Sequence, residues 1–112
     1  MLRHKHLLPS PVSDLLYQVG QNIDLARKRR RLTIAAVCER AGITPQTYRR
    51  LAAGESGIGI GVVAAVLHAL NLEDQLTLIA SPASDEAGIA MERARQATRV
   101  RGGPTVELDT DF

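Results

Sequence analysis

A small all-α protein is the fold class that this sequence predicts, and three observations support it. Apolar residues make up 45% of the 112 residues but aromatic residues only 3%, so aliphatic side chains and alanine must build the core. Antiparallel sandwiches of this size usually carry more aromatic and β-branched residues. The apolar residues recur at helical spacing, and the length suits one domain with roughly 30–40 residues left for tails.

The N-terminal half predicts an arm followed by two helices. Residues 1–13 contain prolines and serines and are expected to form a flexible arm. Asp14 is expected to cap a helix over residues 15–31, whose basic last turn complements the helix dipole. Thr33 is a suitable N-cap for a second helix over residues 34–41. Gly42 is expected to end that helix in the left-handed conformation.

The next segments predict two more helices. Thr44 is expected to cap a third helix over residues 45–53, with a proline at its first position, where a missing N–H is harmless. A loop over residues 55–61 follows, and its glycines match neither a dinucleotide-binding motif nor a P-loop. A fourth apolar helix then ends at Asn71, which tolerates the left-handed conformation.

The remaining residues complete the predicted domain and its tail. Residues 72–79 are expected to form a fifth helix, with an edge strand as the alternative. The compact domain is therefore predicted to span residues 14–80. Residues 81–112 are expected to hold a linker, a short helix over residues 86–97 and a disordered tail from residue 98 onward.

Composition and charge bound the possible partners. No apolar run approaches the roughly 20 residues needed to cross a bilayer, and residues 1–6 lack the apolar stretch of a secretory signal. The single cysteine, Cys38, fits a reducing cytosol. Residues 1–56 hold 10 Lys or Arg against 4 Asp or Glu, whereas residues 57–112 hold 4 against 8. The basic half suits a polyanion, and the acidic half suits a different partner.

The segment from Thr33 to Gly54 has the layout of a helix-turn-helix. Two short helices are joined by a turn that starts at Gly42, and the outward side of the second helix is polar and cationic. A helix that enters a major groove about 12 Å wide must present hydrogen-bond donors and acceptors. Its other side, carrying Tyr48 and Leu51, is expected to pack against the supporting helix.

Residues 15–79 resemble the phage-repressor-like (XRE) family. The matching residues are Val19–Ile23, Leu25–Arg27, Leu32–Thr33, Glu39–Thr44, Thr47, Arg50–Leu51, Gly54 and Leu67–Leu72. The resemblance implies the compact five-helix domain of that family and a DNA-binding function. Within the family, the alanine- and arginine-containing tail after the domain looks like that of HipB-type antitoxins, which pair with a HipA-type kinase toxin and repress their own operon.

The resemblance places the base-reading positions on Pro45, Gln46 and Arg50, and Arg49 is added as a further base contact. Gln46 suits adenine and either arginine suits guanine, whereas Pro45 offers only apolar contact. Phosphate contacts are expected from the basic and hydroxyl residues around this helix, namely Lys28, Arg30, Arg31, Thr33, Thr44 and Thr47.

The expected function is repression of transcription by a cytoplasmic homodimer on a palindromic operator in double-stranded DNA, because one helix-turn-helix reads only a half-site. The fourth helix and residues 72–79 are expected to supply the dimer contact. The finer inference is an antitoxin that also binds a HipA-like toxin through its tail, with Arg93, Arg95 and Phe112 as contacts.

Two alternatives stay open, a stand-alone repressor and a protein–protein adaptor that uses this fold without DNA. The adaptor gains support from Ile34 and Ala52, which stand where the family often has Gln and Glu. The sequence has no catalytic arrangement, no cofactor motif and no set of metal ligands, so neither an enzyme nor a cofactor or metal site is expected.

Overall fold

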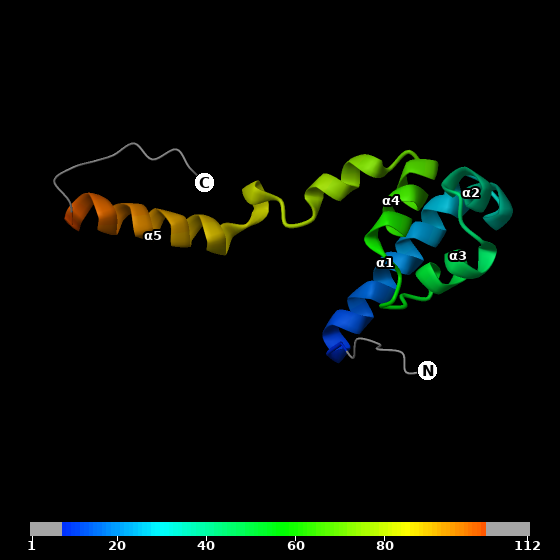
Figure 1. Cartoon of the computed structure of the whole chain (residues 1–112), viewed down its shortest axis with the longest axis horizontal. Helices are drawn as coiled ribbons and strands as arrows, with labels where there is room; N and C mark the ends of the chain where they lie inside the picture. The colour runs from blue at the N-terminus through cyan, green and yellow to red at the C-terminus, as the bar shows by residue number, and fades with distance from the viewer. Residues whose placement is uncertain (1–7, 103–112) are drawn as a thin grey trace. The chain divides into compact units, whose positions relative to one another are not determined.

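The computed structural model describes residues 8–102, and its regular elements are all helical (Figure 1). They are the α-helices α1 (Ser10–Arg29), α2 (Ile34–Ala41), α3 (Pro45–Ala52), α4 (Ile60–Ala69) and α5 (Glu86–Gly102), and the 3₁₀ helices η1 (Glu73–Leu78) and η2 (Pro82–Ser84). The predicted all-α class is therefore confirmed for the described residues. The chain forms two compact units, one ending at Leu76 and one starting at Thr77.

Local capping chemistry sets the ends of α2 and α3 where the sequence predicts them. The Thr33 hydroxyl oxygen accepts a hydrogen bond from the Ala36 amide at 3.0 Å, and the Thr44 oxygen accepts one from the Thr47 amide at 3.1 Å. Gly42 ends α2 with a φ of 71°, a conformation that costs glycine no steric energy. These caps fix the short turn between the two helices.

The first helix differs from the prediction at both ends. It begins at Ser10, so residues 10–13 are helical rather than part of an arm, and Asp14 is not its cap. Pro11 fits the first turn because that turn needs no N–H donor from it. The helix ends at Arg29, since Arg31 takes a φ of 57° and the Leu32 amide donates back to the Arg27 carbonyl at 3.3 Å.

The segment after α4 forms η1 and not an edge strand. A lone extended segment would leave its backbone N–H and C=O groups unpaired, because no described residue forms a strand beside it. A 3₁₀ helix pairs these groups locally, as in the bond from the Gln75 amide to the Leu72 carbonyl at 3.0 Å. Leu72 and Leu76 pack against the core.

The core of the first unit lies between α1, α2, α3 and α4. The other three helices lie around the C-terminal part of α1 (Figure 1). Val37, Tyr48, Val66 and Leu70 have no exposed surface. Each buried aliphatic side chain of this size contributes about 1.5–3 kcal/mol. The core thereby fixes α3 to the rest of the unit through one of its sides.

In the second unit, α5 extends beyond the predicted end at residue 97. The Gly88 amide donates to the Asp85 carboxylate at 3.0 Å, which caps the helix start. The helix continues through residues 98–102, which were predicted to belong to the tail, and the arginines at positions 99 and 101 are good helix formers. Residues 1–7 and 103–112, including the predicted contact Phe112, lie outside the described residues.

Candidate nucleic-acid interface

The α3 helix separates its side chains into an anchored side and an exposed side. Tyr48 and Leu51 are buried, and their spacing of three residues puts them on one side of the helix. The predicted base contacts are all exposed on the other side, and they are Pro45, Gln46, Arg49 and Arg50. The structure therefore brings these four residues together on one accessible surface, which we call the reading surface.

Thr44 and Thr47, at the start of α3, differ in whether their hydroxyl groups can still donate a hydrogen bond. The Thr44 hydroxyl accepts the Thr47 amide and also donates its own hydrogen to the Thr47 hydroxyl oxygen at 3.1 Å. The Thr47 hydroxyl acts only as acceptor in that bond, so its hydrogen remains available for a phosphate oxygen. Of the two predicted phosphate contacts, Thr47 is the better donor and Thr44 is chiefly a cap.

The other predicted phosphate contacts lie at the end of α1 and the start of α2. Lys28, Arg30, Arg31 and Thr33 are all exposed. The Lys28 ammonium lies 3.3 Å from the Asp24 carboxylate and keeps 64% of its side chain exposed. The Arg30 guanidinium donates to the Ala26 carbonyl at 3.0 Å. Three cations are thus concentrated at one helix end, where the helix dipole also favours positive charge.

A partly buried polar cluster, which was not predicted from the sequence, joins α1 to α3. The Tyr48 hydroxyl donates to the Asp24 carboxylate at 2.7 Å, and Arg27 donates to the same oxygen at 3.0 Å. A second nitrogen of Arg27 donates to the Leu32 carbonyl at 2.7 Å. Asp24 therefore holds the anchored side of α3 and the end of α1 together, and we call these residues the Asp24 cluster.

The protonation equilibria of the Asp24 cluster reflect this pairing. Burial alone raises the pKa of Asp24, but the hydrogen bonds from Tyr48, Arg27 and Lys28 together bring it below its ordinary value. Burial and the bond to Asp24 raise the pKa of Tyr48 to about 12. The bond to Asp24 also raises the pKa of Arg27. At neutral pH the cluster therefore holds an ionised carboxylate and a neutral phenol.

The sequence did contain a signal for this cluster. Asp24 is the only acidic residue between Leu15 and Cys38, and it lies three and four residues before Arg27 and Lys28 on one helix. Arg27 lies in the basic stretch at the end of α1, next to the predicted phosphate contact Lys28. The Arg27 side chain is only 13% exposed, so it supports the fold instead.

The C-terminal end of α3 lies directly against α1. A Cβ atom added to Gly54 would be 2.6 Å from the Tyr17 Cα, and the φ of 78° at Gly54 also disfavours any other residue. The Gln21 amide nitrogen donates to the Ala52 carbonyl at 3.3 Å. This close backbone approach fixes the axis of α3 and thus the direction of the reading surface.

The loop after α3 supplies an unexpected partner for one predicted base contact. The Glu55 carboxylate lies 2.9 Å from the Nε atom of Arg50, and both side chains are a little under half exposed. The Glu55 amide also donates to the Arg50 carbonyl at 3.1 Å. Arg50 is therefore held by the loop, whereas Arg49 forms no ion pair with another residue in the range 8–102.

The surface that was predicted to contact a second copy of the chain, on α4 and residues 72–79, is only partly exposed. The Val66 and Leu67 side chains of α4 and the side chain of Leu70, which follows α4, are buried in the core of their own unit. Among the described apolar residues of this region, Ile60, Leu78 and Ile79 are the ones that remain largely exposed. A dimer contact through residues 72–79 would therefore rest on Leu78 and Ile79.

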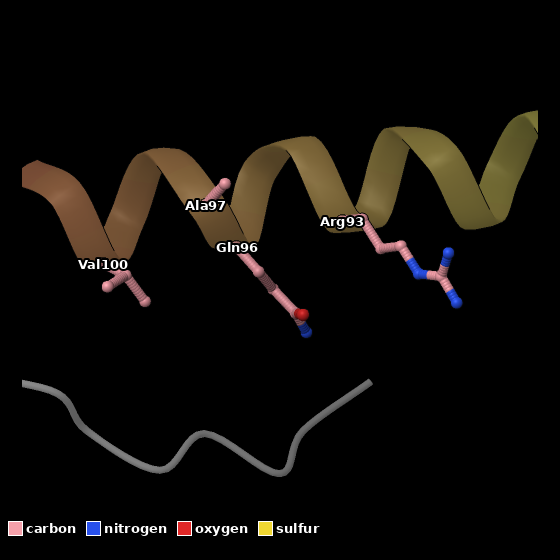
Figure 2. Close-up of a pocket in the computed structure, with 4 residues that line it drawn as sticks. All are labelled: Arg93, Gln96, Ala97 and Val100. Carbon is pink, nitrogen blue, oxygen red and sulfur yellow. The ribbon is translucent and has the colours of Figure 1, made fainter.

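The predicted tail contacts Arg93 and Arg95 are exposed on α5. Arg93, Gln96 and Val100 project from one side of this helix and, with Ala97, line a shallow hollow (Figure 2). Arg95 and Arg99 follow each other by one helical turn, with Thr98 between them. The tail thus presents arginines in more than one direction.

No group of His, Cys, Asp or Glu in residues 8–102 is placed to hold a metal ion. Cys38 is buried in the core, where desolvation raises the pKa of its thiol, as suits a small apolar residue. None of the described helices has the length and apolar character needed to span a bilayer.

Comparison with protein families places this arrangement in a known group. The model of the helix-turn-helix domain family matches residues 18–78, which is more than half of the chain and contains α2, α3 and their connecting turn. This family belongs to the XRE-like group of helix-turn-helix domains. A search of curated proteins found no match to the chain.

Proposed function

Since the chain belongs to the helix-turn-helix domain family of the XRE-like group, we propose that it is a DNA-binding transcriptional repressor that acts as a homodimer. The observation that carries this proposal is the two-sided α3 helix. Tyr48 and Leu51 anchor one side, and the other side exposes an amide and two guanidinium groups. These groups match the acceptor and donor pattern of base edges in a major groove.

The surroundings of α3 support the same conclusion. The cations at the end of α1 and the free hydroxyl hydrogen of Thr47 suit phosphate oxygens on either side of a groove. The Asp24 cluster keeps α3 rigid, which lowers the entropy cost of binding. In this proposal Lys28, Arg30 and Arg31 position the protein, and Gln46, Arg49 and Arg50 read the sequence.

A mobility-shift titration with the DNA upstream of the gene tests this proposal. We expect specific binding whose affinity falls steeply with salt, with a slope of log K against log salt of about −4 to −8, because several phosphates per dimer are neutralised. Binding to unrelated DNA of equal length is the control. A chain that binds neither duplex is the result expected of the adaptor alternative.

The homodimer is proposed to form through exposed apolar residues of the segment after α4. Leu78 and Ile79 are 68% and 62% exposed, and burial against a second copy would remove this surface from water. Sedimentation of the Leu78→Asp and Ile79→Asp variants tests this contact. Both are expected to shift the chain toward monomer, whereas Ile60→Asp is not.

The finer proposal is that the chain is the antitoxin of a HipBA-like operon. Its support is the resemblance of the tail and the exposed Arg93 and Arg95, which suit an acidic surface of a toxin. Phe112 belongs to the same proposal. The neighbouring gene decides this point, because a kinase-like reading frame in the same operon is required. Its absence would leave the stand-alone repressor.

A further inference from the structure

Glu55, in the loop after α3, contacts Arg50 twice. Its amide donates to the Arg50 carbonyl at 3.1 Å, and this backbone bond closes the turn around Gly54. That bond would form with almost any residue at position 55. The carboxylate adds a separate contact to the Arg50 Nε atom at 2.9 Å. The side chain of Glu55 therefore acts on Arg50 itself.

The cost of this contact indicates that it has a function. A carboxylate beside the reading surface repels the phosphates of DNA, so it weakens binding to every sequence. Exposed ion pairs of this kind stabilise a fold little. Neither general affinity nor stability accounts for an acidic residue at this position. Control of the arginine's orientation does account for it.

The chemistry of the guanidinium group gives the consequence. Arginine has donors at Nε and at both terminal nitrogens. The guanidinium group can therefore approach a guanine either with its Nε side or with its end, which carries the two terminal nitrogens. Glu55 occupies Nε, which leaves the pair of terminal nitrogens Nη1 and Nη2 outside this ion pair. Two parallel donors at the end of the side chain match the O6 and N7 acceptors of guanine.

Gly57, in the same loop, lies beside the end of the Arg50 side chain. A Cβ atom added to Gly57 would be 3.6 Å from the Arg50 Nη2 atom, so the guanidinium lies beside the backbone of the glycine-rich loop. The ion pair with Glu55 and the nearby backbone of Gly57 thus border the Arg50 side chain on the loop side. A confined arginine has less freedom to turn toward a phosphate, where it would bind any sequence.

From these contacts we propose that Glu55 is a specificity-determining residue that holds Arg50 for end-on recognition of one guanine in each half-site. The proposal rests on the DNA-binding function proposed above. It assigns a different role to each residue of the pair. Arg50 contacts the base, and Glu55 positions Arg50 without touching DNA.

The test uses the full chain and duplexes that it selects from a randomised DNA library. For each variant, the affinity is measured for the selected duplex and for duplexes changed at single base pairs. Arg50→Ala identifies the base pair that Arg50 reads, where discrimination is expected to fall about 10-fold. Glu55→Ala is expected to reduce discrimination at that same base pair about 3- to 10-fold.

Glu55→Gln is the matched control for charge. It removes the negative charge but keeps an oxygen that can accept from the Arg50 Nε atom. Both Glu55 variants are expected to bind all duplexes a few-fold more tightly, because a charge that repels phosphate is lost. The glutamine variant is expected to keep most of the discrimination, and only the alanine variant to lose it.

The double variant Arg50→Ala with Glu55→Ala completes a double-mutant cycle, which measures the coupling between the two side chains. Adding Glu55→Ala to Arg50→Ala is expected to cause no further loss of discrimination. Equal discrimination in the wild type and Glu55→Ala would overturn the role of Glu55, and so would a loss at a base pair that Arg50 does not read. A wild-type chain that selects no sequence would instead overturn the DNA-binding function itself.

Discussion

The two units of the chain are both helical, but only the first one surrounds its helices with a core. Val37, Tyr48, Val66 and Leu70 are fully buried there. In the second unit no described residue from Thr77 to Val100 is buried, and Met91 is 59% exposed. Helical conformation therefore has two origins in this chain. Tertiary packing holds α1 to α4, whereas local propensity and the Asp85 cap support α5.

This difference has a consequence for recognition. Side chains that read bases must be held in place, because imprecise placement loses discrimination. The reading surface lies on α3, which is anchored by Tyr48 and the Asp24 cluster. The arginines of α5 have no such anchor, so they suit a contact that tolerates adjustment, such as an acidic protein surface that orders the helix further.

The largest expected effect comes from truncating one apolar side chain in each unit. Leu70→Ala is expected to lower the free energy of unfolding by about 2–5 kcal/mol, because it leaves a cavity in the core. Met91→Ala is expected to change it by less than about 0.5 kcal/mol. Urea unfolding followed by circular dichroism measures both. Similar losses in the two variants would contradict the contrast between the units.

A second effect concerns the Asp24 cluster and its pH dependence. Asp24→Asn is expected to destabilise the first unit by about 1–3 kcal/mol at pH 7, since it weakens bonds from buried donors. The pKa of Asp24 is lower in the folded chain than its ordinary value, so the carboxylate stabilises the fold above about pH 4. This contribution disappears as the pH falls through the lowered pKa.

Unfolding of wild type and Asp24→Asn at a series of pH values checks this sign. The difference between the two proteins is expected to be largest at neutral pH and to shrink as the pH falls below the ordinary pKa of an aspartate, about 4, and through the lowered pKa of Asp24. Tyr48→Phe serves as a control, because it removes the hydroxyl donor but keeps the buried ring. A difference that grows on acidification would contradict the assignment.

The third effect is on DNA and not on stability. Gln46→Ala is expected to cost about 1–3 kcal/mol of binding per half-site and to relax the preference at one base pair. Its unfolding free energy is expected to stay within about 0.5 kcal/mol of the wild type, because Gln46 is exposed. Gln96→Ala in α5 is the matched control and is expected to leave base preference unchanged. If Gln46→Ala instead lowered the unfolding free energy and left the base preference unchanged, Gln46 would belong to the anchored side of α3 and not to the reading surface.

The smallest effect on the fold is expected from shortening the tail. Deletion of residues 98–112 is expected to change the unfolding free energy of the first unit by less than about 0.5 kcal/mol, since no described residue of α5 is buried. The same deletion is expected to weaken binding to a co-expressed toxin. Full neutralisation by the truncated chain, with unchanged affinity, would remove the tail from the proposed function.

The sequence predicted those features that depend on neighbouring residues. The caps at Thr33 and Thr44, the turn at Gly42 and the left-handed conformation of Asn71 after α4 were all expected and are present in the structure. Each involves atoms only a few residues apart, so residue type and position suffice to specify it. Helical spacing likewise identified Tyr48 as a core residue, which its burial confirms.

Predictions based on local pattern were wrong where two signals competed. Residues 10–13 contain proline and serine and were expected in an arm, but proline is also suited to a first helical turn. For residues 72–79 the predicted helix is confirmed as the 3₁₀ helix η1, and the alternative edge strand is not formed, because no described strand is available to pair with it. α1 ends at Arg29, two residues before the predicted end at Arg31, because Arg31 takes a left-handed conformation that is uncommon outside glycine.

Sequence alone therefore determined the all-α class, the helix-turn-helix layout and the side of α3 that carries Gln46 and Arg49. Only the tertiary structure decided that Asp24 binds Tyr48, a residue 24 positions away, and that Arg27 serves the fold. It also decided that Glu55 reaches the guanidinium of Arg50. The physical reason is that helix periodicity specifies which side of a helix is buried. Which polar atoms then meet depends on how closely the helices approach, and here the contact of Gly54 with α1 sets that distance.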